Sequence, residues 1–526
     1  MWKFKFNMPP LKGFLLSFLL SLLLLQNVES ARILAIIPIA SYSHQMFYQQ
    51  IWRELALRGH DMVVVTTDPT GEQLPNFKEI NVSETYIPTK EMINASIKES
   101  MFKLFLTNRM MDLDENIALF QMNLPQMQEL IHNKSEHFDL ILAEAFPSMH
   151  MAFKHKYNCP LISVMSIDAF SASHQIMGNP THTVMYPISI LPFQENMNLF
   201  ERTAVFLFEV VMQLSQTRNM EKLNELTREV FGEDVPDVFE LMKESDMLFV
   251  NANPLFSATR PHTPSTINLA GGVHMKKPKP LPKDLKDFLD SGKDGVIYFS
   301  LGSNVKSKEL SLELRETLLK TLSELPYKIL WKFEDDTLPG KPKNVKITKW
   351  APQQDVLRHP NVKLFITQGG IQSLEEALYS HVPMVVLPFM GDQEANAARV
   401  KSKQIGVMLN PHKLTVEDFK AAILEVMENK IYRDNVKRLA DQIQDQPMTP
   451  LERAIWWTEY VLRHKGAQHL KGPTIPLYQY YYFDVFVFLG VILLLLLAVF
   501  VGIIKLLLKG LRKLTGCDKS KKLKKS

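Results

Sequence analysis

A short polar turn between two apolar runs carries residue types suited to binding a charged ligand. The strand-like run Lys363 to Ile366 is followed by Thr-Gln-Gly-Gly-Ile-Gln-Ser at 367–373, and a helix-like run continues to about Leu378. Glycines at such a turn let the backbone approach a ligand, and the free N–H groups at a helix N-terminus attract an anion. A diphosphate would fit this turn. Because most Gly-Gly pairs only permit a tight turn, the flanking residues have to decide between the two interpretations.

Those flanking residues match a longer motif in both type and spacing. Trp350 begins the run Trp-Ala-Pro-Gln and lies 18 residues before Gln368, Glu376 lies eight residues after Gln368, and Asp392 closes the motif together with the next residue. With the whole segment 365–393, they closely resemble the signature of the UDP-glycosyltransferase family, which includes the glucuronosyltransferases. The Gln-Gly-Gly variant resembles the insect branch most. The resemblance extends over most of the chain and is weaker in the first half.

The resemblance implies a binding site for a UDP-sugar. Uracil would stack on Trp350 with Gln353 near the nucleoside, and Glu376 would accept hydrogen bonds from the ribose. Hydroxyls of the transferred sugar would bind Asp392 and Gln393. The diphosphate would be held through hydroxyl and backbone donors, and the residues that would supply these donors are Ser303, Gly370, Gln372 and Ser373.

Each of these residues has a simpler interpretation when it is taken alone. Trp350 would be a core residue, Glu376 part of a solvated helix face, and Asp392 the cap of a helix from 393 to 401. Their joint occurrence at the family's spacing favours the binding site. Gln368 departs from the family, in which most members have histidine beside the phosphates. Glutamine donates a hydrogen bond but cannot become a cation.

His44 is the predicted catalytic base. It follows the first apolar strand in a polar loop, where the family carries a histidine. An acceptor hydroxyl attacks well only when its proton is removed during the attack, and the pKa of histidine suits that task. An acidic partner would orient the ring and stabilise the imidazolium; the family has aspartate at the end of a later strand, where this sequence has Glu144. A lone histidine in a loop is usually a surface residue, so this prediction depends on the resemblance.

The motif contains no set of residues typical of a metal site. Its His, Asp and Glu residues do not have the spacing of metal ligands. The phosphate charge would be met by a helix terminus and neutral donors. We therefore expect a metal-independent transfer with no cofactor, the UDP-sugar being a co-substrate.

Alternating strand-like and helix-like runs must position these groups. In the first half, strands are expected at 33–37, 62–65, 140–143, 161–164 and 247–250, with helices at 45–58 and 149–157. In the second half, strands are expected at 296–301, 329–331, 363–366 and 384–387. Continuous apolar strands separated by helices indicate parallel sheets buried on both faces. The expected fold class is α/β, with two Rossmann-like domains facing across a cleft, as in the GT-B type that the resemblance implies.

The expected domain organisation follows from these runs and from the composition between them. The chain has 526 residues, of which 46% are apolar, enough for two globular cores. A Pro- and Gly-rich stretch at 261–282 is the expected linker. It separates an N-terminal acceptor-binding domain, 31–260, from a C-terminal UDP-sugar-binding domain, 283–447. Residues 448–484 are expected to form a helix at 450–464 and an interface segment, which lie before the transmembrane helix.

Two apolar segments predict the compartment. Residues 1–30 have the layout of a secretory signal peptide, with lysines before a short apolar stretch; an uncleaved anchor is the alternative. Residues 485–504 are long enough for a transmembrane helix, contain no charge, and follow a group of tyrosines, so we expect them to span the membrane. The tail 505–526 has nine Lys or Arg residues and one Asp. Such a basic flank indicates a cytosolic tail and a luminal body.

The last five residues, Lys-Leu-Lys-Lys-Ser, refine this localisation. They resemble the dilysine signal that retrieves proteins to the endoplasmic reticulum, and a flank that binds anionic lipid is the alternative. We expect a single-pass type I protein of the endoplasmic reticulum membrane. The sequence does not decide whether the protein forms a homo-oligomer. Outside the tail, acidic residues outnumber basic ones by four, so nothing suggests nucleic-acid binding.

Covalent features agree with a luminal body. The two cysteines, Cys159 and Cys517, are expected on opposite sides of the membrane, so no internal disulfide is expected. Sequons for N-glycosylation occur at Asn81, Asn94 and Asn133. We expect at least one of them to carry a glycan.

Two stretches rich in Met, Phe and Leu, 104–127 and 170–214, are candidates for the acceptor side. Such residues form adaptable apolar pockets. Ordinary core and a segment dipping into the luminal leaflet are the alternatives, and the sequence does not decide among the three.

The expected function is transfer of a hexose from a UDP-sugar to a hydroxyl of a small lipophilic alcohol or phenol, with inversion and His44 as general base. The insect-like variant favours glucose over glucuronate and suggests detoxification or hormone inactivation. One alternative is a membrane-anchored nucleotide-sugar-binding protein without catalysis, which Gln368 and Glu144 motivate. Another is a dedicated lipid or sterol glycosyltransferase.

Overall fold

The computed structural model describes residues 30–98, 109–186, 188, 190–193, 196–257 and 259–515. It divides into a body that ends at Gly472 and a second unit from Pro473 onward. The expected signal peptide, apart from Ser30, lies outside the described residues. So do Cys517 and the lysines of the proposed retrieval signal.

A seven-stranded parallel sheet forms the first half of the body, in the order β3-β2-β1-β4-β5-β6-β7. Along β1, Leu34 and Ile36 face one apolar core, whereas Ile33 and Ala35 face another. Side chains alternate across a strand, so this sheet is buried on both faces. The strands are β1 (Arg32–Ile36), β2 (Asp61–Thr66), β3 (Phe77–Asn81), β4 (Leu140–Glu144), β5 (Leu161–Met165), β6 (Met247–Val250) and β7 (Thr266–Asn268).

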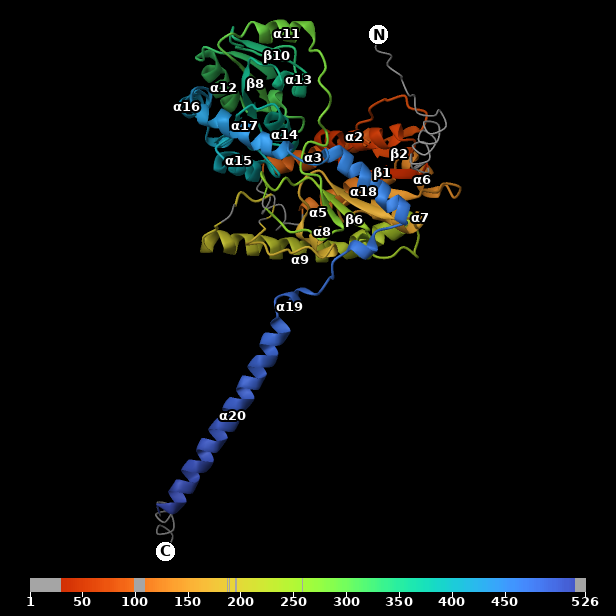
Figure 1. Ribbon diagram of the computed structural model, residues 1–526, viewed down its shortest axis with the longest axis vertical. Coiled ribbons are helices and arrows are strands. Elements are labelled where there is room, and N and C mark those ends of the chain that lie inside the picture. The colour runs from red at the N-terminus through yellow and green to blue at the C-terminus, as the bar shows by residue number, and fades with distance from the viewer. Residues whose placement is uncertain are drawn as a thin grey trace, which may run out of the picture. The chain divides into compact units, whose positions relative to one another are not determined.

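Helices cover both faces of this sheet (Figure 1). The longest, α9 (Leu199–Phe231), begins with a capping box between Asn198 and Glu201. The others are α2 (Tyr42–Leu57), α3 (Tyr86–Lys98), α5 (Arg109–Met122), α6 (Pro125–His132), α7 (Ala152–Tyr157), α8 (Ser171–Ile176) and α10 (Val238–Lys243), with 3-10 turns η1 (Ser83–Thr85) and η2 (Met149–Met151).

A six-stranded parallel sheet forms the second half, in the order β10-β9-β8-β11-β12-β13. Its strands are β8 (Val296–Ser300), β9 (Lys328–Lys332), β10 (Val345–Thr348), β11 (Val362–Thr367), β12 (Met384–Val386) and β13 (Gly406–Met408). Its helices are α11 (Lys283–Asp290), α12 (Leu312–Ser323), α13 (Gln353–Leu357), α14 (Ile371–Tyr379), α15 (Gln393–Ser402), α16 (Val416–Glu428) and α17 (Lys430–Gln444), with 3-10 turns η3 (Ser307–Glu309) and η4 (Pro411–Lys413).

The chain then returns to the first half through α18 (Pro450–His464), which coincides with the predicted helix. Thr449 and Glu452 form a capping box at its start. Ala454, Ile455 and Val461 are buried in the core of the first sheet, and α18 lies against that domain in Figure 1. After the 3-10 turn η5 (Gln468–Leu470), the body ends.

The second unit consists of α19 (Leu477–Tyr480) and the long helix α20 (Phe483–Leu514). Helix α20 extends beyond the predicted span 485–504 at both ends. Among the described residues it is the one helix long and apolar enough to cross a membrane.

All the predicted strands are present, but one expectation needs correction. His44 lies in the first turn of α2 and not in a loop. The predicted helix began too late because the first turn of α2 is polar, and the apolar periodicity of the helix starts only one turn later. The expected linker 261–282 contains β7, which pairs with β6. Strands β3 and β13 were not predicted. The domain boundaries as a whole stay a prediction.

One non-glycine residue of the turn after α14 has a left-handed backbone. His381 adopts a φ of +58°. This left-handed conformation is open to glycine at little cost. His381 therefore occupies a backbone conformation that favours glycine.

Candidate active site

The groups singled out in the sequence gather where the strand order of each sheet reverses. In the first sheet this point lies between β1 and β4, and in the second between β8 and β11. His44 follows β1 and Glu144 ends β4, while Ser303 follows β8 and Gln368 follows β11. Ligands of doubly wound sheets bind at such points, outside the carboxyl ends of the strands.

The turn between β11 and α14 has the geometry that the sequence predicted. Gly369 has a φ of +93°, and a Cβ atom there would lie 2.7 Å from the Val386 side chain. Gly370 is the N-cap of α14. The Gln368 side chain is buried and packs against Gly302 in the turn after β8. A Cβ atom on Gly302 would lie 2.4 Å from Gln368 Nε2. Within the described parts of the chain its Oε1 atom has no hydrogen-bond partner.

Gln353 connects two of the predicted donor residues. Its Nε2 atom donates to Ser373 Oγ at 2.9 Å and to Glu376 Oε2 at 2.8 Å, and its Oε1 atom accepts from the Tyr298 hydroxyl at 3.1 Å. Gln354 donates to the other oxygen of Glu376 at 2.9 Å. Burial raises the pKa of Glu376. This carboxylate is buried, contrary to the alternative of a solvated helix face.

Trp350 is 55% exposed, so it is not a core residue. Tyr42 of α2 meets its ring edge-on, with centroids 5.1 Å apart. The Lys332 ammonium lies 5.6 Å from the ring centroid. A partly exposed indole suits stacking on a planar base.

Asp392 and Gln393 stand at the start of α15. Asp392 Oδ2 accepts from Asn396 Nδ2 at 2.7 Å, and burial raises the pKa of its carboxyl group. Asn396 also donates to the carbonyl of Gly369 at 3.0 Å, which ties this helix to the glycine turn. Gln393 Oε1 accepts from the backbone N–H groups of 389 and 390. Its side chain therefore holds the preceding loop.

Two predicted diphosphate contacts differ in their surroundings. Ser303 is half-buried on the turn after β8, next to Asn304, whose amide donates to the Ser41 hydroxyl of the first half at 3.1 Å. The Gln372 side chain points elsewhere, because it donates to the carbonyl of Ser166 at 3.0 Å. As a first-turn residue of α14, Gln372 contributes only its backbone N–H to the helix N-terminus.

His44 and Glu144 form a close pair. His44 Nδ1 lies 2.8 Å from Glu144 Oε1, and the glutamate is fully buried. The extra methylene relative to aspartate therefore does not prevent the contact. A carboxylate only accepts, so Nδ1 carries the proton. Burial lowers the pKa of His44, but the charge and hydrogen bond of Glu144, together with the charge of Asp392, outweigh burial and leave the pKa raised.

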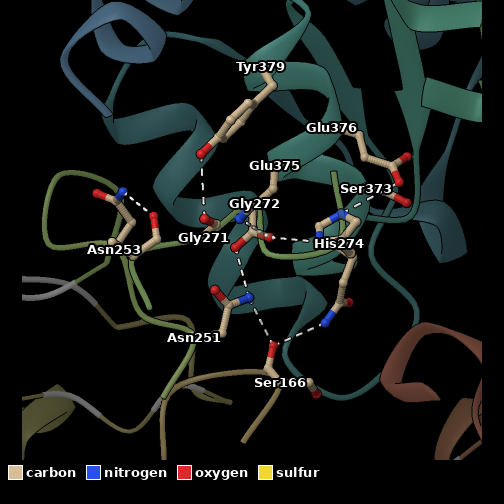
Figure 2. Close-up of polar contacts among 12 residues, drawn as sticks. Ser166, Asn251, Asn253, Gly271, Gly272, His274, Ser373, Glu375, Glu376 and Tyr379 are labelled. Atoms are coloured by element: carbon tan, nitrogen blue, oxygen red, sulfur yellow. Dashed lines mark hydrogen bonds and ion pairs between the residues drawn. The ribbon is translucent and has the colours of Figure 1, made fainter. Parts of the chain in front are cut away.

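A polar cluster beside α14 was not predicted from the sequence. Glu375 accepts from Asn251 Nδ2 at 2.8 Å and from the backbone N–H of Gly272 at 3.2 Å. The ring of His274 lies between Glu375 and Glu376, 3.6 and 3.5 Å from their nearest oxygens (Figure 2). Burial raises the pKa of Glu375 to about 8. No sequence signal marked these residues, because their contacts join positions far apart in the chain.

The acceptor-side stretches divide between core and surface. Met122 and Met127 are buried in the first core, whereas Phe200, Leu207 and Leu214 are exposed on α9. Residues 104–108 lie outside the described ranges. No group of three or more His, Cys, Asp or Glu side chains within those ranges is placed to hold a metal ion.

The sequons lie in the first half of the body. Asn81 and Asn94 are exposed, and Asn133 is half-buried with its Oδ1 atom accepting from Ser135. Their glycosylation stays a prediction. Cys159 is buried and free.

The fold is that of GT-B glycosyltransferases. The crystal structure of a UDP-glucose:anthocyanidin 3-O-glucosyltransferase in complex with UDP is similar with a TM-score of 0.55 and 16% identity, covering 83% of this chain and 100% of that chain. The calicheamicin glycosyltransferase is similar with a TM-score of 0.52 and 17% identity, covering 83% and 99%. At such identities the likeness concerns the fold alone.

The sequence identifies the family within this class. Residues 32–522 match the family described as "UDP-glucoronosyl and UDP-glucosyl transferase", and the chain belongs to this family of UDP-glycosyltransferases. UDP-glucosyltransferase 2 of Dactylopius coccus is 33% identical, over 96% of this chain and 98% of its own length. UDP-glucuronosyltransferase 2C1 of Oryctolagus cuniculus is 31% identical, over 85% and 93%.

Proposed function

We propose that this enzyme transfers a hexose, glucose in preference to glucuronate, from a UDP-sugar to a hydroxyl of a small lipophilic acceptor, with inversion and His44 as general base. The 2.8 Å contact between His44 Nδ1 and Glu144 Oε1 carries the proposal. It fixes the proton on Nδ1 and leaves Nε2 as the basic atom. The raised pKa of His44 suits it to take up a proton.

The reaction proceeds by one displacement. The acceptor oxygen attacks C1 of the UDP-α-sugar while its proton moves to His44 Nε2, and the bond between C1 and the phosphate oxygen breaks. The buried carboxylate of Glu144 stabilises the imidazolium that results. UDP leaves against the N-terminus of α14, where backbone N–H groups and the Gln368 amide meet the phosphate charge without a metal ion. The product is a β-glycoside.

The proposed contacts with the UDP-sugar are those that the resemblance to the family implies, assigned to residues of the candidate site. Uracil stacks on Trp350, and the ribose hydroxyls donate to Glu376, which Gln353 holds in place. The diphosphate contacts Ser303, Gly370 and Ser373, with the backbone of 372. Asp392 and Gln393 bind sugar hydroxyls. Most of the preference for glucose rests on relatives such as UDP-glucosyltransferase 2.

We further propose that α20 anchors the enzyme in the endoplasmic reticulum membrane with the body in the lumen. Its length and composition support a membrane span. Residues 505 to 513 carry four of the basic tail residues and no acid, which favours a cytosolic tail.

Microsomes that contain the full chain test the proposed reaction. They would be incubated with labelled UDP-glucose or UDP-glucuronate and a panel of phenols, sterols and lipid alcohols, and the conjugates analysed by mass spectrometry and proton NMR. We expect β-glucosides of phenols. UDP binding without any conjugate would support the non-catalytic alternative, an α-linked product would contradict inversion, and conjugates of sterols or lipids alone would indicate a dedicated lipid or sterol glycosyltransferase.

A further inference from the structure

Helix α14 presents two neighbouring faces that serve different partners. Ser373 and Glu376 lie three residues apart and both contact Gln353, on the proposed donor side. Gln372 and Glu375 lie one residue earlier, also three apart, and contact the first half of the body. Residues at this spacing share a helix face. One short helix therefore touches both the donor contacts and the opposite domain.

The second face of α14 converges on one backbone carbonyl. Ser166 directly follows β5, and its carbonyl accepts from Gln372 Nε2 and from Asn251 Nδ2, each at 3.0 Å. Asn251 directly follows β6, and its amide also donates to Glu375 Oε1 at 2.8 Å. Figure 2 shows Asn251 pointing between Ser166 and Glu375. All four side chains are buried, where hydrogen bonds of fixed geometry hold a backbone segment in place.

The side chain of the same serine reaches the proposed base. Ser166 Oγ lies 3.3 Å from His44 Nδ1, the atom that also contacts Glu144 Oε1 at 2.8 Å. The single Nδ1–H therefore faces two acceptors on neighbouring strand ends, β4 and β5. Two acceptors restrict the rotation of the imidazole ring more than one does, so they define the direction of Nε2.

We propose that Ser166 is a positioning residue for His44 and that α14 sets its place through Gln372 and Asn251. This inference rests on the proposed role of His44 as the base. Helix α14 then holds the donor with one face and aligns the base with the other. A shift of α14 by a fraction of a hydrogen-bond length misdirects Nε2 from the acceptor hydroxyl. Reaction geometry is sensitive to displacements of this size.

Steady-state kinetics of the full-length enzyme in microsomes test this inference, with UDP-glucose and the phenol of highest turnover. Ser166→Ala removes the hydroxyl but keeps the carbonyl, and we expect kcat to fall about tenfold with the KM for UDP-glucose within about twofold. Ser163→Ala is the matched control, because Ser163 is a buried serine within β5, three residues before Ser166, and its hydroxyl contacts Ser245 at 2.7 Å. We expect it to keep the kcat of the parent enzyme.

Gln372→Met tests the connection to α14, because it keeps the length of the side chain and loses the N–H donor. We expect a similar fall in kcat, and the double variant with Ser166→Ala to be no slower than Ser166→Ala alone, since both act through one serine. Unchanged kcat in Ser166→Ala, an equal loss in Ser163→Ala, or multiplicative losses in the double variant would overturn the proposal. If His44→Ala retains full turnover, the proposed base itself is wrong, whatever the serine variants show.

Discussion

At the scale of single residues, burial and neighbouring charge act in opposite directions on His44. Burial is the largest single influence and lowers the pKa of His44, but the Glu144 carboxylate 2.8 Å away and the charge of Asp392 together raise this pKa by more. A general base must be neutral before it acts. As pH falls, kcat/KM should therefore decrease with the protonation of His44, and this decrease (the acid limb of the pH profile) should follow the raised pKa of His44.

Glu144→Gln should move that limb. Glutamine keeps a carbonyl oxygen for Nδ1 but removes the negative charge, so the pKa of His44 falls and the acid limb of kcat/KM shifts to lower pH. The maximal rate should fall at least about tenfold, because the imidazolium loses its counter-ion. The profile of kcat/KM against pH is the measurement, and an unmoved limb would separate Glu144 from the chemistry.

Glu375 should make stability depend on pH. Burial raises its pKa to about 8 in the folded protein, compared with about 4.3 for an unfolded chain. Between these values the folded state binds more protons, so stability falls as pH rises, by up to about 1.4 kcal/mol per pH unit, and levels off above pH 8. Glu375→Gln does not titrate, so its Tm should depend less steeply on pH between 5 and 8 than that of the parent. Parallel Tm curves would contradict the raised pKa.

Residue roles were predictable only where a motif marked them. His44, Glu144 and the donor residues could be nominated because their spacing matched a family pattern. Ser166, Asn251 and Glu375 carry no such mark, and Asn251 lies 124 residues from Glu375 in the chain. Contacts of this kind follow from the docking of two domains, which periodicity does not describe.

At the scale of elements, the two turns after β8 and β11 depend on each other. Gly302 has a φ of +75°, and a Cβ atom there would lie 2.4 Å from Gln368 Nε2. A side chain at this position would meet both backbone strain and the Gln368 amide. The turn therefore requires glycine for two reasons.

Gly302→Ala should displace Gln368 and weaken UDP binding about tenfold, beyond the backbone cost of about 1 kcal/mol for a non-glycine residue in this conformation. Gly71→Ala separates the two effects, because Gly71 has a φ of +69° and a Cβ atom there would have no other atom within 4 Å. Calorimetric titration with UDP is the measurement. Equal UDP affinity in both variants would show that the contact with Gln368 is unimportant.

Elements were predictable where apolar runs were continuous. β1, β2, β4 and β5 are buried along nearly their whole length. The edge strand β3 reads Phe-Lys-Glu-Ile-Asn and buries only Ile80, so its sequence contains no continuous apolar run. The first turn of α2 has no apolar run either, because its polar side chains lie at the carboxyl edge of the sheet.

At the scale of the whole molecule, contacts between the halves complete the site. Asn304 with Ser41, and Gln372 with Ser166, join residues 263 and 206 positions apart. The fold class was predictable from two series of apolar strands. The contacts between the two halves could not be predicted from the sequence, because each of them forms only when both domains are folded.

Removal of residues 484–526 should release the body from the membrane. Helix α20 is the one candidate span among the described residues, and the body has its own cores and ends at Gly472. Alkaline carbonate extraction of microsomes is the measurement, with the full chain as control. A truncated chain that stays in the carbonate-resistant pellet would indicate a second anchor.

Glycosidase treatment should reveal the side of the membrane on which the body lies. Asn81 and Asn94 are exposed, so a luminal body should lose mass on treatment with an N-glycosidase. Replacement of Asn81, Asn94 and Asn133 by Gln should abolish that shift. A parent protein without any shift would contradict the luminal assignment.

The most direct test of the proposed mechanism is turnover by His44→Ala, with UDP affinity determined on the same preparation. His44 contacts Glu144 and Ser166, whereas the proposed donor contacts lie in the second half of the body. We predict a fall in kcat of about 10²- to 10⁴-fold, the usual contribution of a general base, with the Kd for UDP within about twofold of the parent. Full turnover by His44→Ala would contradict the mechanism.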